Sequence, residues 1–496
     1  MKNRIFISSI LVAIGLLSSC SDSFLQEDYS DPILISYDEN TIKTNQDLQK
    51  FIKGLYSRFG TSSFSGDYFT YQELTGDLGF VSIKNSGYFV NTNAENHLVV
   101  DGGASSGIWS SFYTTISNAN LILAFEGKVP DDPKGGVKSK SLFAHAKVIR
   151  AYNYLALLGL FSPNYGEGDQ SLGVPYPTIY NIEAKLPRET VPNVVNNIIA
   201  DLTSSLADFE ADKTASSIYG NNNSFNVDAV KLLLARTYLY KKDYVKAIEY
   251  ANEIINLGGE LVGGTGNTGS NLAFGTIFTL LGENNPEILF QIEENNIIPS
   301  NNNLQPYWGI SGAYKQNFMA QDFFNSFMPN PLSPNANTAT DVRVRNNAWY
   351  QNNATTYPDS PAPINVKKYL NGPRDVILLR KTEAFFIKAE AQYHSSPATA
   401  FETLKSWVVT HRDPGYNKNL TGTAVLDEIL RQKGFEFFLE GMRFTDMKRN
   451  NKAIVKVQKA NNVPLGEIPV GDRRFIWPIP LSEIQTNPNI KQAPNY

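Results

Sequence analysis

The sequence predicts a mainly α-helical fold, in which helical hairpins form a scaffold and a loop-rich section with a few short strands presents a ligand. Two observations predict it. Apolar residues recur at the spacing of an amphipathic helix in nine windows, whereas strand-like alternation is scarce and short. Between the helical windows, residues 258–370 carry Gly, Pro and Asn at a density that breaks regular structure, and their aromatic residues argue against simple disorder.

The N-terminus carries the pattern of an exported lipoprotein. Lys2 and Arg4 precede an apolar run, Ile5 to Leu17, which is shorter than the roughly 20 residues of a membrane span but suits a signal peptide. The residues LSSC then end at Cys20 and match the bacterial lipobox. Because Cys20 is the only cysteine, we expect it to be lipidated, and we expect no disulfide and no Cys-based zinc site.

The chain divides into five expected parts. These are a signal peptide (1–19), a lipidated flexible stalk (20–43), an N-terminal helical part (44–260), a loop-rich ligand-binding section (261–370) and a C-terminal helical part (371–496), the last three forming one compact fold. No later segment is long and apolar enough to span a bilayer, so we expect the lipid to tether the protein to a membrane that the chain does not cross.

The helical windows follow one another along both helical parts. They are 45–59, 109–126, 139–161, 190–210, 226–240, 243–257, 374–395, 397–411 and 423–449. The clearest unit is 226–257, where Asn226 can cap the first helix and small residues let two antiparallel helices pack closely. Its small residues and tyrosines resemble a tetratricopeptide repeat. A second such pair is expected at 380–411.

The loop-rich section supplies the predicted ligand contacts. Residues 301–350 contain ten asparagines beside several aromatic residues. An aromatic face suits the apolar C–H face of a sugar ring, and a neutral amide both donates to and accepts from hydroxyls. The predicted contacts are Trp308 with Tyr307 and Asn303, then Trp349 and Tyr350 with Asn346 and Asn347, and thirdly Tyr88 and Asn91 of an earlier loop.

Other aromatic and basic residues are expected to have structural roles. Trp109 and Trp407 lie in helical windows and Trp477 lies in a WPIP motif, so all three are predicted to be core residues. Arg343 and Arg345 are predicted to be exposed charges. Loop aromatic residues could also pack against a partner protein.

Composition and motifs exclude several classes of function. The chain has 44 basic and 48 acidic residues, a balance without the basic footprint of a nucleic-acid-binding protein. It contains no P-loop, no GxGxxG after a strand, no HExxH and no His-rich metal pattern. Glu436 and Glu440 could be a glycosidase carboxylate pair, but the basic residues around them favour ion pairing.

No cofactor is expected apart from the lipid on Cys20. Asp67, Glu73 and Asp77 could offer oxygen atoms to a structural calcium ion, although their spacing is not that of an EF-hand. Calcium is therefore the weaker reading of these three carboxylates.

Five stretches resemble the SusD/RagB family of outer-membrane lipoproteins. They are the lipobox, IWSSFYTTISNANLIL, AHAKVIRAYNYLALLGLFSPNYG with LGVPYP, LLRKTEAFFIKAEA, and the C-terminal set FLEGMRFTDMKR, WPIP and NPNIKQ. Together they span nearly the whole chain. The sequence departs from the usual family pattern at Lys433-Gly434 and in its last four residues, which are scaffold positions.

The resemblance implies a function. Such proteins are exported to the cell exterior, bind oligosaccharides or in some cases peptides, and lie as a lid on a SusC-like TonB-dependent β-barrel transporter without catalytic activity of their own. The first expectation is therefore a glycan-binding lipoprotein of the outer membrane, and the second is a peptide-capturing protein of the same complex. A surface glycosidase and a scaffold that binds only protein remain as alternatives.

Overall fold

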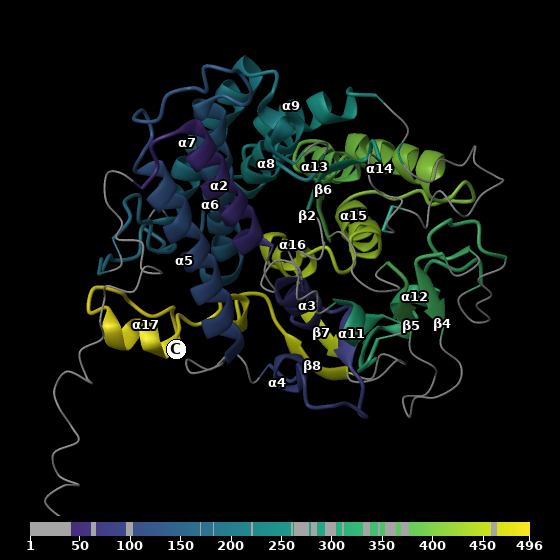
Figure 1. Cartoon of the computed structure of the whole chain (residues 1–496). Coiled ribbons are helices and arrows are strands. Elements are labelled where there is room, and N and C mark those ends of the chain that lie inside the picture. The colour runs from purple at the N-terminus through teal and green to yellow at the C-terminus, as the bar shows by residue number, and fades with distance from the viewer. Residues whose placement is uncertain are drawn as a thin grey trace, which may run out of the picture. The chain divides into compact units, whose positions relative to one another are not determined.

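Helices make up most of the structure, a computed structural model (Figure 1). The structure describes residues 41–60, 66–95, 103–168, 170–181, 183–219, 222–258, 261, 277–278, 285–292, 304–309, 312–330, 338–345, 348–352, 364–368, 376–457 and 464–496. The predicted signal peptide, Cys20 and most of the stalk lie outside these residues, as do Asn303, Asn346 and Asn347. Residues Thr44–Tyr496 form one compact unit.

The helices confirm the prediction of a mainly α-helical fold. They are α2 (Asn45–Phe59), α3 (Tyr68–Leu74), α4 (Val90–Asn93), α5 (Gly103–Leu123), α6 (Ser139–Phe161), α7 (Val191–Ala211), α8 (Val227–Tyr240), α9 (Tyr244–Ile255), α11 (Leu304–Trp308), α12 (Gln321–Asn325), α13 (Thr382–Tyr393), α14 (Pro397–His411), α15 (Thr423–Glu436), α16 (Arg443–Arg449) and α17 (Leu481–Thr486). Figure 1 shows α5, α6 and α7 packed in succession, with α2 against α5 and α6.

The α8–α9 hairpin has the features expected of a tetratricopeptide-like unit. The Asn226 side chain caps α8 by accepting a hydrogen bond from the Ala229 amide at 2.9 Å. Ala235, Ala247 and Ala251 are fully buried, which allows the two helices to pack closely. The α13–α14 pair forms a second hairpin, and α9 packs against α13.

Two predicted helical windows are interrupted. In the window 374–395, residues Val376–Arg380 form strand β6 instead, because a short run of buried apolar residues does not distinguish strand from helix. In the window 423–449, α15 ends at Glu436, and Leu439 and Gly441 adopt positive φ angles of 61° and 80° before α16 begins. A Cβ on Gly441 would lie 2.7 Å from the Phe69 ring, so glycine is required at this turn.

Within the ranges that the structure describes, three small antiparallel sheets accompany the helices. Strands β1 (Gly79–Val81), β3 (Asn317–Met319), β5 (Ile364–Val366) and β4 (Tyr350–Asn352) form a sheet in the order β1-β3-β5-β4. Strands β2 (Ile288–Ile292) and β6 form a second sheet, and β7 (Ile454–Val457) and β8 (Pro464–Ile468) form a third. The first sheet joins an early segment of the chain to the loop-rich section, since Phe80 pairs with Phe318.

A buried ion network connects the loop-rich section to α15. Its acidic members are Glu287, Asp341, Glu436 and Glu440, and its basic members are Arg343, Lys368, Arg380 and Arg412. The four formal charges of each sign cancel, and all eight residues are buried. At its centre the Glu436 carboxylate accepts from Arg380 at 2.7 Å and from Arg412 at 2.8 Å. The predicted ion-pairing role of Glu436 and Glu440 is confirmed.

Candidate functional site

Trp308, ranked first among the predicted ligand contacts, is a core residue. Its side chain is fully buried, and its ring packs edge-on against Phe438 at a centroid distance of 5.4 Å. Its indole N–H donates to the Thr70 hydroxyl at 3.0 Å. Because both the ring and its only donor are used inside the fold, Trp308 has no exposed surface to offer a ligand, contrary to the prediction that it contacts one.

Trp349 and Tyr350 are also buried, contrary to the prediction that they face a ligand. Trp349 covers the ion network, with the Lys368 ammonium 4.6 Å from its ring centroid. The Tyr350 ring stacks on Phe435 at 4.6 Å, and its hydroxyl donates to the Phe435 carbonyl. Arg343, predicted to be exposed, is fully buried and pairs with Asp341 at 2.6 Å. An aromatic face beside buried cations gains a cation–π attraction, which accounts for the position of Trp349.

The exposed aromatic surface is instead built from tyrosines. Tyr88 and Tyr314 retain 46% and 40% of their accessible surface, and no other Phe, Tyr or Trp side chain in the described ranges is as exposed. Their ring centroids lie 4.9 Å apart with the planes inclined by 56°. Tyr307, which is 7% exposed, stacks almost parallel to Tyr314 at 4.9 Å and lies 5.2 Å from Tyr88. We call Tyr88, Tyr307 and Tyr314 the tyrosine cluster.

Short elements from two distant segments bring the cluster together. Tyr88 lies in the loop between β1 and α4, Tyr307 lies on α11, and Tyr314 lies on the turn between α11 and β3. Adjacent residues of α11 point in different directions, so Trp308 enters the core while Tyr307 reaches the cluster. Phe89 supports the cluster from behind, meeting Tyr307 edge-on at 5.0 Å.

The cluster offers neutral hydroxyl groups. Burial, followed by the neighbouring Tyr88 and Tyr314 hydroxyls, raises the pKa of Tyr307 to about 12. A side-chain hydrogen bond with Tyr88 raises the pKa of Tyr314. Both residues are therefore protonated at neutral pH, and each hydroxyl can donate and accept. Asn91 on α4 is exposed, so its side-chain amide is accessible for hydrogen bonds to a ligand.

The exposure of Tyr314 gave no strong signal in the sequence. It is one of several aromatic residues in the loop-rich section, and only its small and polar neighbours, in GISGAYKQ, set it apart from the apolar surroundings of a core residue. Tyr88 was predicted as a third choice, and its exposure agrees with that role. Trp109, Trp407 and Trp477 are buried, which confirms that they are core residues.

Two of the three carboxylates considered for calcium, Asp77 and Glu73, have protein partners. Asp77 forms a two-pronged ion pair with Arg443 at 2.6 and 2.8 Å. Glu73 is fully buried and accepts from the Leu439 amide at 2.9 Å. Within the ranges that the structure describes, no group of three or more His, Cys, Asp or Glu side chains is placed to hold a metal ion.

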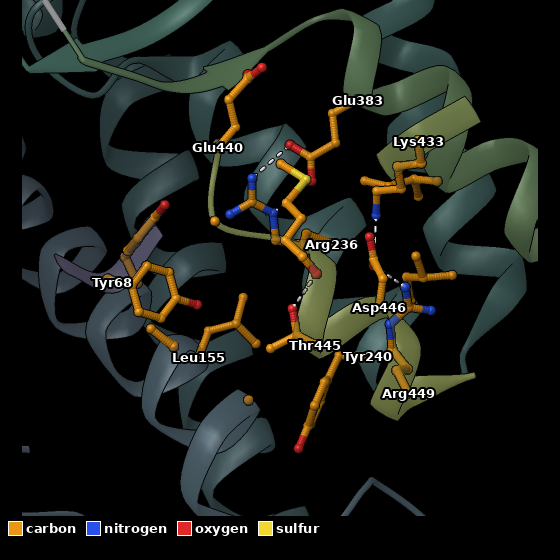
Figure 2. Close-up of a pocket in the computed structure, with 17 residues that line it drawn as sticks. Tyr68, Leu155, Arg236, Tyr240, Glu383, Lys433, Glu440, Thr445, Asp446 and Arg449 are labelled. Atoms are coloured by element: carbon orange, nitrogen blue, oxygen red, sulfur yellow. Dashed lines mark hydrogen bonds and ion pairs between the residues drawn. The ribbon is translucent and has the colours of Figure 1, made fainter. Parts of the chain in front are cut away.

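A cavity with apolar and charged lining residues lies between α6, α8, α13 and α16 (Figure 2). Its volume is about 90 Å³, enough for a few water molecules. Figure 2 shows its charged groups paired with one another: Arg236 with Glu383, and Asp446 with both Lys433 and Arg449. A space of this size does not admit an oligosaccharide.

The fold is a helical scaffold that carries an exposed pair of tyrosines, and comparisons with known proteins identify its family. The N-terminal half, residues 24–239, matches a SusD-like family model described as starch-binding and associating with the outer membrane. Residues 329–496 match the model of the SusD family. The chain belongs to the SusD family. No helix within the described ranges has the length and apolarity needed to cross a bilayer.

Individual relatives agree over the full length. The SusD-like protein P38 of Formosa agariphila is 21% identical, and the alignment covers 100% of this chain and 99% of that protein. A putative sugar binding protein of Bacteroides vulgatus has a crystal structure similar to this one, with a TM-score of 0.75 and 26% identity over 92% of this chain and 100% of that chain. A SusD superfamily protein of the same species gives a TM-score of 0.76 at 22% identity, over 92% of this chain and 100% of that chain.

Proposed function

We propose that this protein is a non-catalytic, cell-surface lipoprotein that binds oligosaccharides through the tyrosine cluster and delivers them to a SusC-like TonB-dependent transporter, over which it acts as a lid. The observation that carries the proposal is the pair of exposed, inclined rings of Tyr88 and Tyr314. Membership of the SusD family and the similarity to a putative sugar binding protein support it. Lipidation of Cys20 would anchor the protein in the outer membrane.

The chemistry of the cluster suits a neutral, hydroxyl-rich ligand. The free face of an aromatic ring is negative and attracts the C–H groups of a sugar ring, which also lose contact with water. The tyrosine hydroxyls and the Asn91 amide can then hydrogen-bond the sugar hydroxyls in either direction. The cluster residues lie on loops and short elements supported by a helical scaffold, which is a usual position for binding residues.

The buried carboxylates support a non-catalytic protein. A glycosidase needs one carboxylic acid that is protonated and in contact with the substrate. Burial alone would raise the pKa of Glu436, but the charges of Arg412 and Arg380 outweigh it and hold that pKa well below its usual range. Glu436 is also fully buried. It is therefore an ionised structural group, out of reach of a polysaccharide.

A panel of immobilised oligosaccharides tests the binding step. We expect the full-length chain, purified in detergent, to bind at least one member of a panel of plant, algal and starch-derived oligosaccharides. Loss of one stacking ring should weaken binding by about tenfold, so Tyr314→Ala should show this loss. Tyr250→Ala is the matched control, because Tyr250 stacks on Tyr238 of the α8–α9 hairpin, outside the cluster. Failure of the wild-type chain to bind any member would refute the proposal.

Extraction of the native membrane complex tests delivery and separates the two ligand classes. The lipoprotein should bring a large β-barrel protein with it, and bound oligosaccharide should be found by mass spectrometry. Peptides in place of oligosaccharide would favour the peptide-capturing alternative. Absence of a barrel would contradict the transport role, and Cys20→Ser should release the protein from the membrane fraction.

A further inference from the structure

We propose that Gln316 is the positioning residue of the tyrosine cluster: its buried side-chain amide holds the 82–89 loop so that Tyr88 meets Tyr314 in the observed geometry. The inference rests on the proposed function, because it concerns the same surface. It adds a residue that has no exposed atom of its own to offer a ligand, since Gln316 is fully buried.

The side chain of Gln316 uses both ends of its amide on the loop. Its Oε1 accepts a hydrogen bond from the Ser86 amide at 2.8 Å. Its Nε2 donates to the Tyr88 carbonyl at 2.6 Å. These contacts span more than 200 positions of sequence, so they tie the loop to a segment that only the tertiary fold brings near it. The loop residue that carries the exposed ring is thus bonded directly to Gln316.

The backbone of Gln316 holds the other side of the cluster. Its carbonyl accepts from the Ser82 amide at 2.8 Å, at the start of the loop. Its amide donates to the Tyr307 carbonyl at 3.1 Å. Tyr314 lies two residues before it on the same turn. One residue therefore contacts or directly neighbours the segments that bear all three rings.

Each of the two exposed tyrosines is followed in the sequence by a residue with a positive φ angle. Phe89, directly after Tyr88, has φ 59°, and Lys315, directly after Tyr314, has φ 47°. Residues other than glycine rarely adopt a positive φ angle, and this conformation persists only where the surrounding structure holds it. Gln316 is hydrogen-bonded beside the first strained position and is adjacent in sequence to the second. Gln316 thus braces the first of the two strained turns, whereas at the second the Pro306 carbonyl accepts from the Tyr314 and Lys315 amides at 3.0 and 3.1 Å.

Glutamine is the side chain that this position requires. The group must accept from one backbone amide and donate to one backbone carbonyl at the same time, which a neutral amide does. A leucine of similar size would leave the Ser86 amide and the Tyr88 carbonyl without these partners. A glutamate would direct a carboxylate at the Tyr88 carbonyl. Gln316→Leu therefore removes both hydrogen bonds, whereas Gln316→Glu keeps an acceptor for the Ser86 amide and loses the donor to the Tyr88 carbonyl.

The brace can be tested without any ligand. The Ser86 amide is protected by Gln316, so its hydrogen exchange in the full-length chain should accelerate by about tenfold in Gln316→Leu, the loss expected for one hydrogen bond. Gln321→Leu is the control, because Gln321 is a buried glutamine on α12 whose amide contacts Asn325 and not the loop. Unchanged exchange at Ser86 in Gln316→Leu would overturn the inference, whether or not any sugar binds.

A double-mutant cycle tests the link to binding, with the tightest-binding oligosaccharide of the panel as the probe. Gln316→Leu should weaken binding by about tenfold, and Gln321→Leu should not. In a Tyr88→Ala background the effect of Gln316→Leu should largely disappear, because a residue that acts through Tyr88 has nothing left to position. Full additivity would overturn the positioning role. If Tyr88→Ala and Tyr314→Ala both bind the oligosaccharide as the wild-type chain does, the proposed site itself is refuted. If those two variants bind more weakly but Gln316→Leu does not, only the inference about Gln316 is refuted.

Discussion

Replacing Glu436 by glutamine should strongly destabilise the fold. The substitution keeps the shape of the side chain and removes one negative charge. Glu436 accepts from three arginines, with Nη1 of Arg343 at 3.3 Å in addition to the shorter contacts from Arg380 and Arg412. The buried network would pass from zero net charge to +1, and these cations have no bulk water around them.

The magnitude follows from the cost of breaking a buried ion pair. Removal of one partner typically costs about 3–5 kcal/mol, because the remaining charge stays buried without compensation. Glutamine retains one acceptor oxygen, so we expect the lower end of that range, about 3 kcal/mol. A loss of this size is a large part of the roughly 5–15 kcal/mol that stabilises an ordinary domain.

Urea unfolding followed by tryptophan fluorescence measures this effect. The midpoint for Glu436→Gln should fall well below that of the wild-type chain at pH 7. Glu402→Gln is the matched control, since Glu402 lies exposed on α14 and its substitution should change stability by about 0.5 kcal/mol at most. A loss below about 1 kcal/mol in Glu436→Gln would refute the claim that the network is buried and ion-paired.

Three further predictions concern buried groups. Burial lowers the pKa of His145 from 6.5 to about 3, so between these pH values only the unfolded chain takes up a proton at this position. The free energy of unfolding should therefore decrease as the pH falls from 6.5 towards 3. The urea midpoint of His145→Gln should decrease less steeply over this pH range than that of the wild-type chain. Burial raises the pKa of Glu73 from 4.5 to about 8, so between these pH values the folded chain keeps a proton that the unfolded chain releases. The free energy of unfolding should therefore decrease as the pH rises from 4.5 to 8. In Glu73→Gln the free energy of unfolding should change less with pH over this range. Trp349→Ala should cost about 3–5 kcal/mol in urea unfolding, while the folded fraction should bind oligosaccharide as the wild-type chain does. A binding defect of Trp349→Ala with unchanged stability would restore Trp349 as a ligand contact.

The local chemistry of the sequence was sufficient for the hairpins. Asn226 and the alanines of α8–α9 act through neighbours a few residues away, so their caps and packing could be predicted from spacing alone. Strand β6 could not be predicted from spacing alone, because its pairing with β2 depends on residues some 90 positions earlier. The same holds for the interruption after α15, where Gly441 is required by its approach to Phe69.

The exposure of the candidate ligand contacts could be predicted from the sequence only in part. Trp308 and Trp349 lie in a stretch rich in Asn and Pro, which made them resemble surface residues. Their burial depends on partners from elsewhere in the chain, Thr70 for the indole of Trp308 and Lys368 for the ring of Trp349. Composition therefore indicated an aromatic and amide surface, while the tertiary fold decided which rings remain exposed.

We propose that sugar rings bind on the exposed tyrosines. The most direct measurement is a crystal structure of the protein soaked with the tightest-binding oligosaccharide of the panel. We expect a sugar ring in contact with the free faces of Tyr88 and Tyr314, with Asn91 within hydrogen-bonding distance of a hydroxyl. An oligosaccharide bound elsewhere, with the tyrosine cluster left uncovered, would contradict it.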